Sequence, residues 1–164
     1  MKVNSIQDFY EIRQDGKIIP EGMTVEQIFA LGEISRVVEA HWTNAANQRP
    51  VSLKSPFGVF AYIVPGREFI AAMVHTKKGN GSAGDLIVVN PDGSVRFKVP
   101  PVQTINGQDM KGVFRGITNT PKAADGFFGA VFEVDFGNIY LSNAQFRLDI
   151  DAATGEVVGC SETR

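Results

Sequence analysis

The sequence predicts a mainly β (α+β) fold: a curved antiparallel sheet or sandwich of seven to nine short strands with one packed helix near residues 24–31. Three observations lead to this prediction. Apolar stretches are short and often alternate with polar residues, glycine and proline turns recur at the spacing of β-hairpins, and one stretch carries a strong helix signal. Since no linker-like tract separates these elements, we expect residues 1–164 to form a single domain.

The first elements surround the predicted helix. Residues 8–13 are expected to form a strand that ends at an Asp-Gly turn. Thr24 and Gln27 have the spacing of a capping box, in which each side chain satisfies a free amide of the first turn. Gly32 is a suitable left-handed stop, so we expect a helix of two to three turns. Its expected apolar face consists of Val25, Ile28, Phe29 and Leu31.

After this helix the pattern predicts one strand after another. Residues 34–42 either continue the helix past Gly32 or switch to a strand, and the β-branched Val37 and Val38 favour the strand. Residues 91–94 (Pro-Asp-Gly-Ser) have the composition of a hairpin turn, and residues 102–126 are expected to be strand fragments joined by loops. The remaining expected strands cover residues 57–64, 69–76, 86–90, 95–99, 127–136, 139–141, 146–151 and 157–158.

Composition excludes several classes of protein. Hydrophobic residues make up 43% and charged residues 21% of the 164 positions, which is typical of a globular domain. A net charge of −2 is unlike a strongly basic nucleic-acid binder, and no apolar stretch is long enough to span a membrane. Cys160 is the single cysteine, and residues 1–8 lack the apolar centre of a signal peptide. We therefore expect a cytoplasmic location.

The charges are unevenly distributed along the chain. Counted from the sequence, residues 1–48 carry a net charge of −3, residues 49–122 of +6 and residues 123–164 of −5. A folded surface that mixes these segments is one interpretation. The other is a polarised surface with an acidic patch that attracts a basic partner.

One motif resembles a nucleotide-binding loop but lacks its context. Residues 79–84 read Gly-Asn-Gly-Ser-Ala-Gly, which matches the dinucleotide fingerprint. That fingerprint requires a helix after the glycines, whereas residues 86–90 predict a strand. We interpret the glycines as a hairpin loop and expect no nucleotide cofactor.

Metal and catalytic sites have little support in the sequence. His41, His75 and Cys160 include no pair at ligand spacing, and no nucleophile motif is present. The neat carboxylate pairs are Glu133/Asp135 and Asp149/Asp151, each on one face of an expected strand. Because these faces are expected to be exposed, nothing would raise a carboxyl pKa as a general acid requires. We expect no metal, no cofactor and no enzymatic activity.

The same carboxylates suit recognition better than catalysis. If the two strands share a sheet, four carboxylates lie on one solvent face, where they are either solvated surface or a contact for a basic partner such as a nucleic-acid-cleaving enzyme. Direct nucleic-acid binding is not expected, because Arg96 and Lys98 share a strand face from which Phe97 points away.

In these traits the chain resembles the immunity proteins of bacterial polymorphic-toxin and contact-dependent growth inhibition systems. The resemblance covers the whole chain and consists of small size, slight acidity, many hairpins and no catalytic constellation. It implies one-to-one neutralisation of a cognate toxin, commonly a nuclease. On this hypothesis the contact surface comprises Glu133, Asp135, Asp149 and Asp151, with Trp42 and Tyr140 as aromatic anchors.

Two other hypotheses remain open. The chain is alternatively a small ligand-binding β domain, or a small enzyme of unknown substrate, with a cavity near His41, Trp42 or His75. A structural or assembly subunit is the third possibility. A deep pocket that holds His75 beside a carboxylate would favour the second hypothesis.

Overall fold

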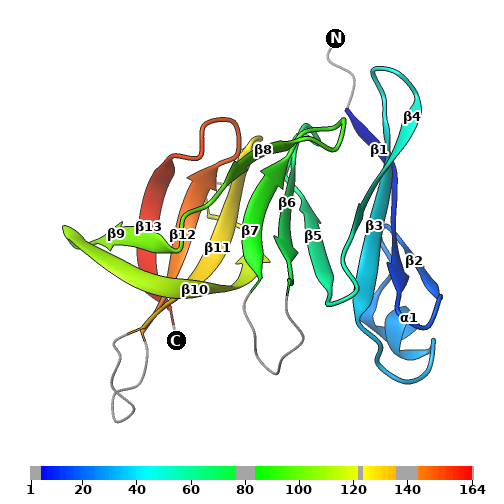
Figure 1. The fold of residues 1–164 in the computed structure, drawn as a ribbon, viewed down its shortest axis with the longest axis horizontal. Coiled ribbons are helices and arrows are strands. Elements are labelled where there is room, and N and C mark those ends of the chain that lie inside the picture. Colours follow the sequence, from blue (N-terminus) through cyan, green and yellow to red (C-terminus); the bar gives the residue numbers. More distant parts are fainter. Residues whose placement is uncertain (1–4, 77–83, 122–123, 136–143, 164) are drawn as a thin grey trace.

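The computed structural model describes residues 5–76, 84–121, 124–135 and 144–163. Within these ranges the chain forms thirteen strands and one helix, and every strand pair is antiparallel (Figure 1). The predicted mainly β class is therefore confirmed. The strands are more numerous than the seven to nine expected, and they fall into three sheets.

The first sheet has the order β2-β1-β3-β4 and lies at one end of the molecule (Figure 1). β3 covers most of the segment where the β-branched valines favoured a strand. The bounds of the four strands are β1 Ile6–Arg13, β2 Ile18–Pro20, β3 Val37–Asn44 and β4 Arg49–Lys54.

Helix α1, Val25–Phe29, connects β2 to β3 and begins with the predicted capping box. Gln27 N donates to Thr24 Oγ1 over 3.1 Å, and Thr24 N donates to Gln27 Oε1 over 2.9 Å. The helix is shorter than the two to three turns expected, and none of its residues is buried. Gly32 has a φ of +105°, so it does mark the end of the helical segment. In the described part of the chain, no helix is long and apolar enough to cross a membrane.

The middle sheet has the order β5-β6-β7-β8. Residues 91–94 form the predicted turn, in which Ser94 N donates to Asp92 Oδ1 over 2.9 Å and Gly93 has a φ of +90°. The glycine-rich segment at residues 79–84 is followed by strand β7, as predicted, and not by the helix that the dinucleotide fingerprint requires. The strands are β5 Val59–Ile63, β6 Ile70–Val74, β7 Asp85–Val89 and β8 Val95–Lys98.

The third sheet has the order β13-β12-β11-β10-β9. Strand fragments joined by loops were expected over residues 102–126, and the structure has β9, a turn at residues 106–107, β10 and then a loop in that segment; β10, with eleven residues, is longer than a fragment. A bulge between Phe114 and Gly116 interrupts its pairing with β11, which explains why simple alternation fails there. The expected strand at 139–141 lies outside the described residues. The strands are β9 Val102–Ile105, β10 Gln108–Thr118, β11 Phe127–Val134, β12 Gln145–Asp151 and β13 Val157–Thr163.

The middle sheet is buried on both faces. Ala71 and Met73 of β6 belong to the apolar cluster that the middle sheet shares with the third sheet. Ile70 and Ala72, which alternate with them, belong to the cluster shared with the first sheet. The molecule is therefore three β-layers with two cores, and Figure 1 shows the middle sheet between the other two.

Candidate functional site

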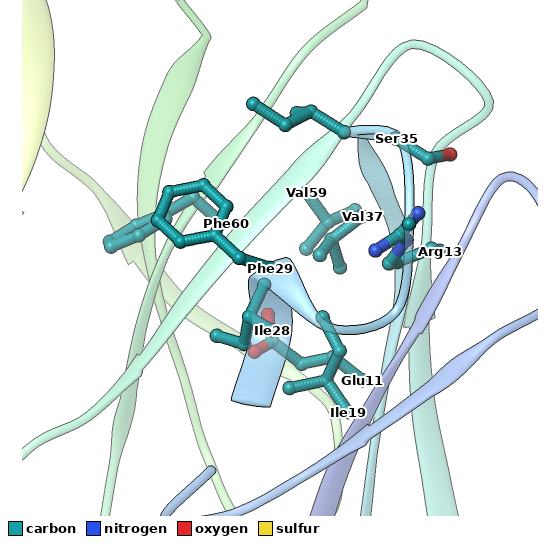
Figure 2. Close-up of a pocket in the computed structure, with 11 residues that line it drawn as sticks. Glu11, Arg13, Ile19, Ile28, Phe29, Ser35, Val37, Val59 and Phe60 are labelled. Atoms are coloured by element: carbon teal, nitrogen blue, oxygen red, sulfur yellow. The ribbon is translucent and has the colours of Figure 1, made fainter. Parts of the chain in front are cut away.

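A cavity of about 310 Å³ opens beneath α1, between the first sheet and β5. Figure 2 shows Glu11 and Arg13 reaching into it from β1, with Phe29 and Phe60 beside it. The cavity lies at the edge of the core between the first and middle sheets, since Val59 both lines the cavity and belongs to that core. The lining residues are Glu11, Arg13, Ile19, Ile28, Phe29, Gly32, Ile34, Ser35, Val37, Val59 and Phe60.

Basic side chains hold the loop that follows α1 over this cavity. Arg13 Nη2 donates to Glu33 O over 2.5 Å, and Lys17 Nζ donates to Leu31 O. Arg36 Nη1 donates to Phe57 O over 3.0 Å, which ties the far end of the loop to the segment before β5. These hydrogen bonds fix the loop at several points, although α1 is only five residues long and has no buried residue.

The floor of the cavity carries an acidic side chain on an otherwise buried face. Glu11 lies in register with Ile19 of β2 and Ala40 of β3, both of which are buried. Its carboxylate has no hydrogen bond or ion pair within the part of the chain that the structure describes. Burial raises the pKa of Glu11 to about 7, so this carboxyl group changes charge near neutral pH.

Arg13 lies beside Glu11 but is already compensated. Its Nη2 donates to Asp15 Oδ2 over 2.5 Å as well as to the Glu33 carbonyl, and the side chain is only 2% exposed. Its Nε is buried without a hydrogen-bond partner in the described structure. Because Asp15 balances Arg13, an ionised Glu11 leaves the floor with a net negative charge.

The mouth of the cavity is apolar and exposed. Phe29, Ile34 and Phe60, here called the apolar rim, are 61%, 86% and 48% exposed. Large apolar side chains that share one concave surface are characteristic of binding sites rather than of ordinary solvated surface. Two of the helix residues expected to pack into a core, Ile28 and Phe29, therefore line an open recess instead.

Phe60 also lines a second cavity, of about 380 Å³. Its lining includes His75 and Arg115, and Arg115 Nη2 contacts Glu133 Oε2 at 2.8 Å. No carboxylate is among the residues that line this cavity with His75. Phe60 is common to both cavities, which makes β5 the centre of the recessed surface.

The predicted acidic face is only partly as expected. β11 and β12 are neighbours in one sheet, as the prediction required. Glu133 is paired with Arg115, and Arg147 Nε contacts Asp149 Oδ1 at 3.1 Å. Asp149 was expected on an open surface, but it is buried, because its register neighbours on β11 and β13 are both glycines that leave room for the carboxylate.

The other predicted contact residues are scattered. Asp135 lies exposed just beyond β11, and Asp151 Oδ1 accepts from Ala153 N over 2.9 Å in the turn after β12. Trp42 is 2% exposed and donates from Nε1 to Pro91 O over 2.8 Å, so it belongs to the core between the first and middle sheets. Tyr140 lies outside the described residues. A role for any of them in partner binding stays a prediction.

The histidines and the cysteine do not assemble into a reactive site in the described structure. His41 stacks on Tyr10 at 4.9 Å between ring centroids and lies 2.7 Å from Glu39 Oε1. Cys160 is exposed on β13. Among the described residues, no three His, Cys, Asp or Glu side chains are grouped as a metal ion requires.

Sequence reasoning missed the residues that form the cavity. A weak signal was present, because α1 is apolar at Val25, Ile28 and Phe29 and yet too short to bury them. Glu11 and Phe60 come together only through the pairing of distant strands, which no local pattern reveals.

Comparison with known proteins gives one informative match. No protein-family model matches the sequence, and no curated protein matches it either. A chain in the solved structure of Tne2 in complex with Tni2 is 34% identical, with a TM-score of 0.86, over 97% of this chain and 99% of that one.

Proposed function

The chain belongs to the same family as its counterpart in the complex of Tne2 with Tni2, and from this premise we propose that it is an immunity protein that binds and neutralises a cognate toxin. In this role it acts by occupying the toxin, not by catalysing a reaction. The chain corresponds to Tni2, and its partner corresponds to Tne2.

The observation that carries this proposal is the extent of the match. It covers nearly all of both chains at 34% identity, so the whole fold, not a shared hairpin, is that of a protein found in a two-protein complex. The recess around Phe60 supports the proposal, since an exposed apolar rim is a common feature of protein-binding surfaces.

The finer expectations from the sequence stay predictions. They are a bacterial, cytoplasmic site of action, a contact-dependent inhibition system, and a toxin that is basic and a nuclease. The single cysteine supports the reducing cytoplasm, and the net charge of −2 is compatible with a basic partner.

A toxin-rescue assay tests the proposal. The carboxyl-terminal region of the protein encoded immediately upstream is induced in a bacterial host with and without this chain. We expect growth arrest that this chain relieves, and co-purification of the two proteins in a 1:1 complex. Degraded nucleic acid in the arrested cells would support a nuclease, and intact nucleic acid would exclude it. Arrest without relief, together with no complex, would contradict the immunity role.

A ligand-binding β domain remains the second candidate, and one observation favours it. The cavity beneath α1 has the volume of a small ligand site, for which about 300 to 1,000 Å³ is usual. On this alternative, a small molecule raises the thermal midpoint of wild type and not of a variant with a filled cavity, Val59→Phe. Stabilisation by the purified toxin alone would exclude it.

A further inference from the structure

We propose that the cavity beneath α1 is a toxin-docking site that receives a Lys or Arg side chain of the toxin, with the cation at Glu11 and the aliphatic stem against the apolar rim. This inference rests on the proposed immunity function and names the surface and the chemistry by which that function is carried out.

Charge is the first argument for a cationic occupant. A carboxylate that is partly removed from water and has no partner is unfavourable; Glu11 is half-buried, and the described structure offers it no hydrogen bond or ion pair. Arg13 does not fill this role, because its guanidinium is held by Asp15 and by the Glu33 carbonyl. A cation from outside would complete the site.

Shape is the second argument. A long basic side chain keeps its aliphatic stem against apolar surface while its charged group reaches a polar partner. The cavity offers this sequence of environments, with the exposed Phe29 and Phe60 at the mouth and Glu11 at the floor (Figure 2). Ile34, which is also exposed, lines the same cavity. A volume of about 310 Å³ accommodates one such side chain together with part of the backbone that carries it.

Rigidity is the third argument. The hydrogen bonds from Arg13, Lys17 and Arg36 hold the loop over the cavity before any partner arrives. A preformed site loses less conformational entropy on binding, which favours the tight association that neutralisation needs.

The surroundings of Glu11 determine how binding depends on pH. Arg13 is the charged group that faces it from its own strand, and the cavity residues contributed by α1, β2, β3 and β5 are all uncharged. Glu39 and His41 of β3 are in register with Ile12 and Tyr10, on the opposite face of the sheet. A bound cation holds Glu11 ionised, so on acidification the affinity should fall in proportion to the fraction of Glu11 that is ionised in the free protein.

The experiment measures the affinity of the full chain for the toxin by calorimetry. Phe29→Asp and Glu11→Gln are each expected to weaken binding about tenfold or more. Val95→Asp is the control for Phe29→Asp, because Val95 is 58% exposed on β8, at the opposite edge of the middle sheet. Glu26→Gln is the control for Glu11→Gln, since Glu26 is exposed on α1 and does not line the cavity. Both controls are expected to bind within about twofold of wild type.

Measuring the affinity at two pH values tests whether a cation binds at Glu11. With a free pKa of about 7 for Glu11, wild type should bind about eightfold more weakly at about pH 6 than at about pH 7.5. Glu11→Gln should lack this component, whatever other groups titrate in the toxin. Thermal midpoints of all four variants confirm that they are folded.

The outcomes separate this inference from the immunity role. If wild type does not bind the toxin, the proposed function fails. If wild type binds and both cavity variants bind equally well, the docking site is overturned and the immunity role stands. If Phe29→Asp weakens binding and Glu11→Gln does not, the cationic occupant is overturned. A dimer of this chain that Phe29→Asp dissociates would also overturn it, because the recess would then receive a second copy.

Discussion

The carboxyl group of Glu11 should make the stability of this protein depend on pH in a direction opposite to that of most acidic residues. Its pKa is about 7 in the folded chain, against an ordinary value of 4.5 that applies when the chain is unfolded. Between these values the folded state binds more protons than the unfolded state. The stabilising contribution is therefore complete below about pH 4.5 and is lost as the pH rises through about 7.

The magnitude follows from the gap between the two pKa values. A gap from 4.5 to about 7 corresponds to about 3 kcal/mol of unfolding free energy. Glu11→Gln retains the shape and polarity of the side chain but removes the ionisable group. At about pH 8 the variant should therefore be more stable than wild type by about 3 kcal/mol relative to their difference at about pH 4.5.

Urea unfolding of both proteins at several values between about pH 4.5 and about pH 8 measures this effect. The quantity that matters is the difference in unfolding free energy between the two proteins, because other titrating groups cancel in it. Glu26→Gln serves as the control and should show a difference that does not change with pH. A constant difference for Glu11→Gln would refute the reasoning, since the carboxylate would then be hydrated or paired in the folded state.

Three further substitutions test other parts of the fold by the same unfolding measurement. Gly112→Ala should lower the unfolding free energy by about 2 kcal/mol or more, because the new Cβ would lie 2.3 Å from the carbonyl oxygen of Glu133. An unchanged urea midpoint would show that β10 and β11 are not so close. Asp149→Ala should lower the unfolding free energy by about 2 kcal/mol, since it leaves Arg147 without its partner and creates a small void. A loss below about 0.5 kcal/mol would contradict the ion pair with the buried Asp149. Thr24→Ala should cost about 1 kcal/mol by removing the cap of α1, and Thr24→Ser should restore most of it, which a purely packing role would not predict.

Local features of the fold were predictable from the sequence because their determinants are local. The capping box at Thr24 and Gln27 and the turn at residues 91–94 each depend on side chains that reach their own neighbouring backbone. The eleven residues of β10 were not recognised as one strand, since the bulge between Phe114 and Gly116 breaks the alternation that identifies a strand.

Burial was harder to predict, because it depends on strands that pair at a distance. Asp149 alternates with buried residues and so was placed on the surface, yet Gly129 and Gly159 lie beside it in register and make room for it. Burial raises the pKa of Glu11, and the cavity around it is lined in part by α1 and by Phe60 of β5, about 50 residues away in the sequence. The candidate site therefore became visible only with the structure.

The sheet with two buried faces has a consequence for how this family can diverge. Any larger residue at Ala71 or Ala72 must displace neighbours in a core, and no face of β6 offers a position where change is harmless. Phe29 and Ile34 lie outside both cores. If the rim docks the toxin as proposed, a lineage can exchange rim residues one at a time as its partner changes, while the residues of the two cores are retained because they hold the fold.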